Sequence, residues 1–224
     1  MFYVKNNGLC FLFQKSFGTS GVNAIGSFQL SQLNSSSVKS KLKAAGINTN
    51  SKQYKAAVKQ MMSAGNGAMY GNIQGIKNLM SHYDKDGDYI NPVNGLAGLL
   101  VTDENESSRK RIISIPDSSK EEMYELTKKE FLRENGVHNG DTTKRTDVYN
   151  NLYRKMSKKD RLAAGYTLEK YERIYRQAFY DAAKKADPNW EIGKPIKDGA
   201  LDSVTRETAE SGKSPAQATL DTKI

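Results

Sequence analysis

Three aspartates at alternate positions, Asp84, Asp86 and Asp88, have the spacing in this sequence that points most directly to chemistry. A tight loop turns its first, third and fifth positions to one side, where three carboxylates can bind one hard cation. Asn91 and Asn94 follow closely and carry amide oxygens that suit the same ion. We therefore expect a metal site at these five residues, with calcium as its ion.

Residues 84–95 resemble a degenerate EF-hand or dockerin calcium loop, which implies weak calcium binding. Two positions depart from that pattern: Tyr89 stands where the loop has a glycine, and Gly95 stands where it has a bidentate acid. If the central glycine is treated as deleted, Asn94 takes the last position and supplies only a neutral ligand. The alternative is an acidic loop that binds no metal and pairs with the lysines before it.

Lysines dominate the chain before this loop. Residues 1–83 contain nine lysines, no arginine and no carboxylate, whereas residues 84–108 carry six acids and one lysine, within a total net charge of +9. A segment without carboxylates cannot neutralise its own lysines, so their field is solvated, paired with the acidic block or directed at an anionic partner. We expect a non-catalytic binding protein whose lysine-rich N-terminal part contacts nucleic acid, a cell-wall polymer or an acidic protein.

Two groups of basic residues are the candidates for that contact. The first lies in the N-terminal part and comprises Lys39, Lys41, Lys43, Lys52, Lys55 and Lys59. The second lies further along and comprises Arg109, Lys110, Arg111, Lys155, Lys158, Lys159 and Arg161.

Nucleic-acid binding is a specific alternative, because tyrosines near the second group could stack on bases while the cations neutralise phosphates. No helix-turn-helix, zinc-finger or RNP-type signature accompanies these residues. Tyrosines at helical spacing also suit the edge of a hydrophobic core, where their hydroxyl groups reach water.

Signals for catalysis are sparse. The one cysteine, Cys10, lies in an apolar run typical of a small buried side chain, and the two histidines are His82 and His138. The glutamates of residues 121–125 fall in a first helical turn, where acids favour the helix dipole. No nucleophile elbow, zinc-binding HExxH or Rossmann fingerprint is present. We expect a protein without enzymatic activity; a hydrolase with an unrecognised site is the remaining alternative.

The elements that position these residues are mainly helices. Apolar periodicity, N-cap residues and closing glycines predict helices over residues 37–45, 52–64, 69–83, 119–134, 146–156, 157–165 and 167–186. Two β-rich runs, residues 99–102 and 111–115, predict a small β-hairpin.

The predicted fold class is therefore mainly α, with one helical domain over residues 38–190. We expect residues 1–37 to form a flexible arm, with a short hairpin marked by Asn7-Gly8. Residues 191–224, which contain almost no aromatic side chains, are expected to form a loose tail.

Composition excludes several classes of protein. No apolar run approaches the ~20 residues needed to span a bilayer, and a single cysteine excludes an intramolecular disulfide framework or a cysteine-based zinc site. The apolar run at residues 9–13 is too short for a signal peptide, so we expect a cytoplasmic protein, with non-classical export as the alternative.

The chain as a whole resembles uncharacterised Lys- and Asn-rich proteins of Gram-positive bacteria or their phages. The resemblance is carried by residues 44–59 and 149–190. It implies no activity.

Overall fold

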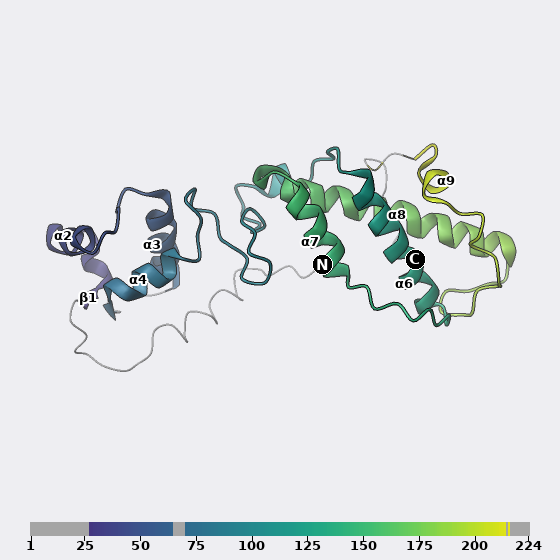
Figure 1. Ribbon diagram of the computed structural model, residues 1–224, viewed down its shortest axis with the longest axis horizontal. Coiled ribbons are helices and arrows are strands. Elements are labelled where there is room, and N and C mark those ends of the chain that lie inside the picture. Colours follow the sequence, from purple (N-terminus) through teal and green to yellow (C-terminus); the bar gives the residue numbers. More distant parts are fainter. Residues whose placement is uncertain (1–26, 65–69, 214, 216–224) are drawn as a thin grey trace. The chain divides into compact units, whose positions relative to one another are not determined.

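A computed structural model describes residues 27–64, 70–213 and 215 of this protein (Figure 1). The described residues are mainly helical, which confirms the predicted fold class. They fold as two compact units, Met1–Leu100 (unit 1) and Val101–Ile224 (unit 2), each with its own hydrophobic core. In the part of the chain that is described, none of the helices combines the length and apolarity that crossing a membrane requires.

The described residues of unit 1 form three α-helices and a two-stranded antiparallel sheet. Strand β1 pairs with β2 through Phe28 opposite Gly71 and Gln29 opposite Tyr70. The side chain of Ser35 caps the first helix by accepting a hydrogen bond from the backbone N–H of Val38. The elements in chain order are β1 (Phe28–Gln29), η1 (Leu30–Gln32), α2 (Ser36–Ala44), α3 (Lys52–Ala64), β2 (Tyr70–Gly71) and α4 (Ile73–Met80).

The core of unit 1 takes in part of the predicted N-terminal arm. Leu42, Met61 and Ile76 contribute fully buried side chains from the three helices. Phe28 and Leu33 are also buried in this cluster, so residues 28–33 are packed rather than loose. Burial of a few apolar side chains is enough to hold this segment, although polar residues surround them. The predicted hairpin at Asn7-Gly8 lies outside the described residues.

Unit 2 is built on one long helix that contacts several shorter ones (Figure 1). Arg145, the first residue of α7, forms ion pairs with Glu130 of α6 and Glu172 of α8. The elements are α5 (Glu106–Arg109), α6 (Asp117–Glu134), α7 (Arg145–Lys155), η2 (Lys158–Asp160), α8 (Arg161–Ala186) and α9 (Arg206–Glu210).

The predicted hairpin over residues 99–115 is wrong: the structure has no strand in this segment, which contains the short helix α5. The apolar run that follows lies along α8 instead. The backbone N–H of Ile113 donates to Oγ1 of Thr167 at 3.1 Å, and Ile115 is buried in the core of unit 2. A side chain of α8 therefore supplies a hydrogen bond that a strand partner would have supplied.

Residues 191–213 differ from the expected loose tail, and the boundary between the two units lies at residue 100 instead of residues 37 or 190. Ile196, Leu201 and Val204 are buried in the core of unit 2. The backbone N–H of Gly193 donates to Oδ1 of the buried Asn135 at 2.7 Å. These contacts fix the segment on unit 2, because its few apolar residues pack into the hydrophobic core of that unit.

Candidate functional site

The Asp84–Asp88 loop follows α4 and forms a tight turn. Tyr83 and Tyr89 pair as an antiparallel bridge at its base. Within the turn, the backbone N–H of Asp84 donates to the carbonyl oxygen of Asp88 at 2.9 Å. Gly87 has a φ of 85° at the tip, a conformation that side chains rarely adopt. Gly87 therefore makes the sharp turn, at the fourth position and not the sixth.

The turn brings the three predicted aspartates together. Oδ1 of Asp84 accepts hydrogen bonds from the backbone N–H groups of Asp86 and Asp88, both at 2.9 Å. One carboxylate oxygen from each of the three lies within 4.8 Å of the other two. Calcium binds oxygen at about 2.3–2.6 Å, so ligands on opposite sides of one ion are about 5 Å apart. The three carboxylates can therefore reach a single cation.

Asn91 and Asn94 belong to a second turn, which the bridge between Ile90 and Ala97 closes. Oδ1 of Asn91 accepts from the backbone N–H of Val93 at 2.8 Å, and Oδ1 of Asn94 accepts from that of Leu96 at 3.0 Å. Asn91-Pro92 therefore shapes a turn and begins no helix. The described residues consequently lack the second helix of an EF-hand.

The start of α3 holds the loop in place. Nε2 of Gln53 donates to the carbonyl oxygens of Met80 and Tyr83, at 2.9 and 2.8 Å, and so ties α3 to the end of α4. A Cβ atom on Gly87 would lie 3.0 Å from the carbonyl oxygen of Lys52. Burial, and then the charge of Tyr89, raise the pKa of Tyr83 to about 12. In the sequence, the dipeptide Asp86-Gly87 indicates this turn. No local pattern indicates that Gln53 supports it.

The lysines of the first predicted group are exposed. Unit 1 contains ten lysines, no arginine and three acids, and the loop holds all three of these acids. The structure places the first three lysines on α2 and the other three on α3, and all six side chains face solvent: Lys39, Lys41, Lys43, Lys52, Lys55 and Lys59.

The second predicted group makes contacts within unit 2. Arg111 forms an ion pair with Asp160 at 3.6 Å, which brings the segment of residues 109–111 beside that of residues 158–161. Arg109 is buried. Further contacts join side chains of this group to nearby partners: Lys110 to Glu106, Lys155 to Glu122, and Nε of Arg161 to the carbonyl oxygen of Tyr153.

The residues weighed for catalysis do not converge among the described residues. His82 and His138 are both exposed and belong to different units. Glu121 pairs with Arg206 at 2.8 Å, and Glu122 pairs with Lys155 at 3.0 Å. These two carboxylates thus link elements of unit 2. Cys10 lies outside the described residues.

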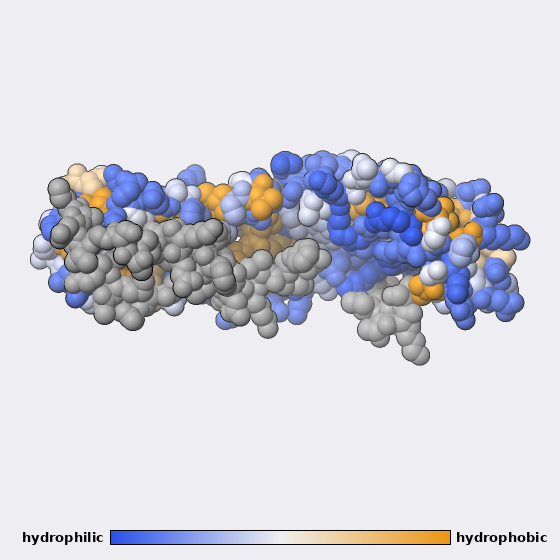
Figure 2. All heavy atoms as spheres, turned by 90° about the horizontal axis from the view of Figure 1, so that it is seen from below, coloured by the Kyte–Doolittle hydropathy of each residue, from blue (hydrophilic) through white to orange (hydrophobic). Residues whose placement is uncertain are grey.

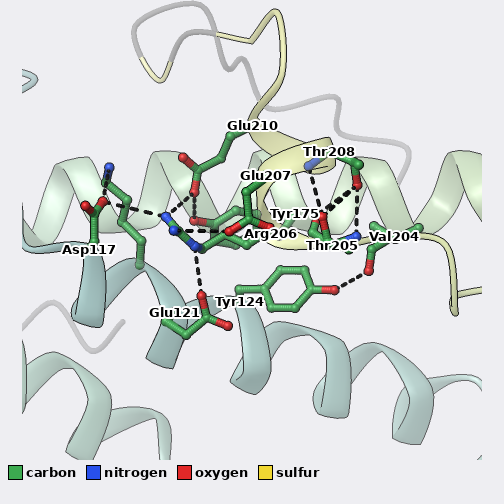
Figure 3. A network of polar contacts seen from close by, with 11 residues as sticks. Asp117, Glu121, Tyr124, Tyr175, Val204, Thr205, Arg206, Glu207, Thr208 and Glu210 are labelled. Carbon is green, nitrogen blue, oxygen red and sulfur yellow. Dashed lines mark hydrogen bonds and ion pairs between the residues drawn. The ribbon is translucent and has the colours of Figure 1, made fainter.

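A cluster of polar contacts around Arg206 is missed by the sequence analysis (Figure 3). Arg206 begins α9 and forms ion pairs with Glu121 of α6 at 2.8 Å and with Glu210 at 3.3 Å. Oη of Tyr175 on α8 donates to Glu210 at 2.6 Å, and Oη of Tyr124 on α6 donates to the carbonyl oxygen of Val204 at 2.5 Å. The cluster fastens α9 to the two longest helices.

On the face that Figure 2 displays, the described surface of unit 2 is mostly hydrophilic. Figure 2 shows apolar residues only in small separate patches on the face of unit 2 that it displays. Scattered exposed apolar side chains are normal for a folded protein. They do not single out a docking surface.

Comparisons with known proteins give one match. A family model described as "Domain of unknown function (DUF3879)" matches residues 47–224, which include the acidic loop and all of α3. No curated protein and no solved structure matches the chain. The resemblance to an uncharacterised family is confirmed by this match.

Proposed function

The chain belongs to this family of unknown function, and we propose from the residues themselves that it is a non-catalytic binding protein. Unit 1 contacts an anionic partner through the exposed lysines of α2 and α3. The observation that carries the proposal is the placement of charge: six exposed lysines on two helices of a unit whose only acids lie in one loop.

The two helices do not neutralise this charge with acids of their own. Lys41, Lys43 and Lys55 are exposed, and no acid lies within four positions of any of them. Helix surfaces are commonly balanced by acids three or four positions away, and these helices lack that balance. A patch with one sign of charge attracts polyanions and speeds their association at low salt.

Retention on heparin tests the proposal, provided that overall charge is controlled. We expect replacement of the six lysines of α2 and α3 by glutamine to lower the salt concentration at which the chain elutes. A variant that loses the same charge from unit 2, at the exposed residues Lys144, Lys159, Lys185, Lys194, Lys197 and Lys213, should elute near the wild type. Equal shifts in both variants would overturn the proposal, because retention would then depend on net charge alone.

Calcium binding at Asp84, Asp86 and Asp88 is the second candidate function. Its support is the approach of the three ligand oxygens to within 4.8 Å of one another. Like charges at such distances repel each other, and a divalent cation removes that repulsion. Asn91 and Asn94 point their Oδ1 atoms at backbone N–H groups of their own turn, so the aspartates carry this proposal and water completes the coordination.

Thermal unfolding of the full chain tests this second function. We expect millimolar calcium to raise the melting temperature relative to chelator, since a ligand that binds only the folded state stabilises it. Asp86→Asn should abolish that rise, while Asp103→Asn, outside the loop, should retain it. The idea fails if calcium shifts neither the wild type nor the control, or shifts Asp86→Asn equally.

A further inference from the structure

Three Asn-Gly pairs lie among the described residues: Asn94-Gly95, Asn135-Gly136 and Asn139-Gly140. In such a pair the side-chain amide of the asparagine can react with the backbone nitrogen of the glycine, because glycine has no side chain to hinder the approach. The pairs Asn7-Gly8 and Asn66-Gly67 lie outside the described residues. The contacts of the three described pairs differ, and these contacts decide which pair can react.

Two of the pairs share one local conformation. Oδ1 of Asn139 accepts a hydrogen bond from the backbone N–H of Asp141 at 3.0 Å, and Oδ1 of Asn94 accepts one from that of Leu96, also at 3.0 Å. Each is an Asx turn, which folds the side-chain carbonyl back along the backbone of the following glycine. The donated N–H also favours negative charge on Oδ1, and such charge develops when a nucleophile attacks Cγ.

The glycines of these two pairs differ in the contacts of their backbone N–H groups. The N–H of Gly95 donates to the carbonyl oxygen of Asn91 at 2.8 Å, whereas no described residue accepts a hydrogen bond from the N–H of the exposed Gly140. Both glycines have a positive φ, 71° for Gly95 and 65° for Gly140, so their backbone conformations match. The nitrogen of Gly140 is therefore open to solvent, while that of Gly95 must first break a hydrogen bond.

The third pair is protected by burial. Asn135 is 1% exposed. Its Nδ2 donates to the carbonyl oxygen of Phe131, and its Oδ1 accepts from the backbone N–H of Gly193, both at 2.7 Å. The N–H of Gly136 donates to the carbonyl oxygen of Arg133 at 3.3 Å. Reaction at this pair therefore requires local unfolding.

We infer that Asn139 is a site of spontaneous deamidation and reacts fastest of the three described pairs. A base from solvent takes the proton of the Gly140 nitrogen, and this nitrogen attacks Cγ of Asn139. The new N–Cγ bond closes a succinimide ring. The bond from Cγ to Nδ2 breaks, and Nδ2 takes a proton from water and leaves as ammonia. Water then opens the ring at either carbonyl carbon, which leaves aspartate or isoaspartate. No group is oxidised or reduced, and water is the co-reactant.

The modification changes the contacts of the loop between α6 and α7. Nδ2 of Asn139 donates to the carbonyl oxygen of Lys129 on α6 at 2.7 Å. The product has a carboxylate oxygen in place of Nδ2, and an ionised carboxylate cannot donate. Its negative charge lies two positions from Asp141, whose carboxylate pairs with Lys129 at 3.4 Å. Deamidation therefore removes one of the contacts that fasten this loop to α6.

Peptide mapping of the full folded chain by mass spectrometry tests the inference. The protein is kept in mildly alkaline buffer and sampled over several weeks, and fragment ions locate the mass gain of amide-to-acid conversion at each asparagine. We expect conversion at Asn139 to be at least about tenfold faster than at Asn135, where local opening must come first, and faster than at Asn94. In guanidinium chloride the three pairs should convert at similar rates, because glycine follows each asparagine.

Two variants are matched controls. Asn139→Gln should remove the fast conversion, because the longer side chain would have to close a larger ring, while Asn94→Gln should leave the rate at Asn139 unchanged. Conversion of Asn94 or Asn135 as fast as that of Asn139 in the folded chain would overturn the inference. An unconverted Asn139 in the folded chain, after a time that converts it fully in guanidinium chloride, would overturn it too.

Discussion

Gly165 of α8 lies directly against the ring of Tyr153 of α7. A Cβ atom on Gly165 would be 2.5 Å from Oη of Tyr153 and 3.1 Å from Cε1. Real side chains do not approach so closely, so the two helices can pack at this distance only because residue 165 has no side chain. The glycine therefore continues α8, although glycine is the residue that most often ends a helix.

We expect Gly165→Ala to destabilise unit 2. Alanine should gain about 1 kcal/mol through its helix propensity, while overpacking against the tyrosine costs about 1–3 kcal/mol. The net loss is on the order of 1 kcal/mol, measured as a lower urea midpoint of Trp190 fluorescence. In a Tyr153→Ala background the same substitution should become stabilising. A stabilising effect in the wild-type background would contradict the close contact.

The Arg206 cluster gives a second prediction. The side chain of Arg206 is 18% exposed and pairs with acids on both α6 and α9. Arg206→Gln should lower the free energy of unfolding of unit 2 by about 1–3 kcal/mol, between the values for exposed and buried pairs. Glu207→Gln is the control, because the Glu207 side chain is 72% exposed; it should have little effect. Equal effects of the two variants would remove any special role for Arg206.

A fall in pH should destabilise unit 2 through protonation of Asp117. A hydrogen bond from Lys120, and then the charges of Lys120 and Arg206, hold the pKa of Asp117 below its usual value. Because the folded-state pKa is the lower one, this carboxylate stabilises the fold above about pH 4 and loses that effect as the pH falls through the folded value.

Urea midpoints between pH 6 and pH 2.5 test the direction of this pH dependence of stability. Asp117→Asn should show a smaller loss of stability on acidification than the wild type. The exposed Asp198→Asn serves as the matched control and should follow the wild type. A steeper loss in Asp117→Asn would show that the sign is wrong.

The segment after α8 provides a prediction about the core. Leu201 is 4% exposed, and Leu→Ala substitutions in cores cost about 2–5 kcal/mol. We expect Leu201→Ala to lower the unfolding midpoint of Trp190 fluorescence by a corresponding amount. Ile192→Ala, at a side chain 48% exposed in the same segment, should change it far less. Similar small effects at both positions would indicate a loose segment.

Much of the fold could be predicted because its signals are local. Helices α2, α3, α6 and α7 begin and end within two residues of the predicted limits, since caps and apolar periodicity act over a few positions. The start of α8 was missed because the role of Gly165 depends on Tyr153, a residue of another helix. The extended run at residues 111–115 was misassigned because Thr167, 54 positions after Ile113, is its partner.

The candidate sites, too, could be predicted where their signals are local and not where they depend on distant residues. The convergence of Asp84, Asp86 and Asp88 follows from their alternation around a glycine turn, which the sequence displays. The support from Gln53 could not be predicted, because its acceptors lie 27 and 30 positions away. The exposure of all six lysines of α2 and α3 depends on which face of each helix is buried, and that is a property of the tertiary packing.

The most direct test of the central claim, that unit 1 presents the surface for an anionic partner, is a lysine footprint of the wild-type chain. Brief acetylation with and without saturating heparin, read by mass spectrometry, reports each lysine separately. We expect protection at the six exposed lysines of α2 and α3, and unchanged modification at Lys144 and Lys185 of unit 2. Protection spread evenly over both units, or confined to unit 2, would contradict the claim.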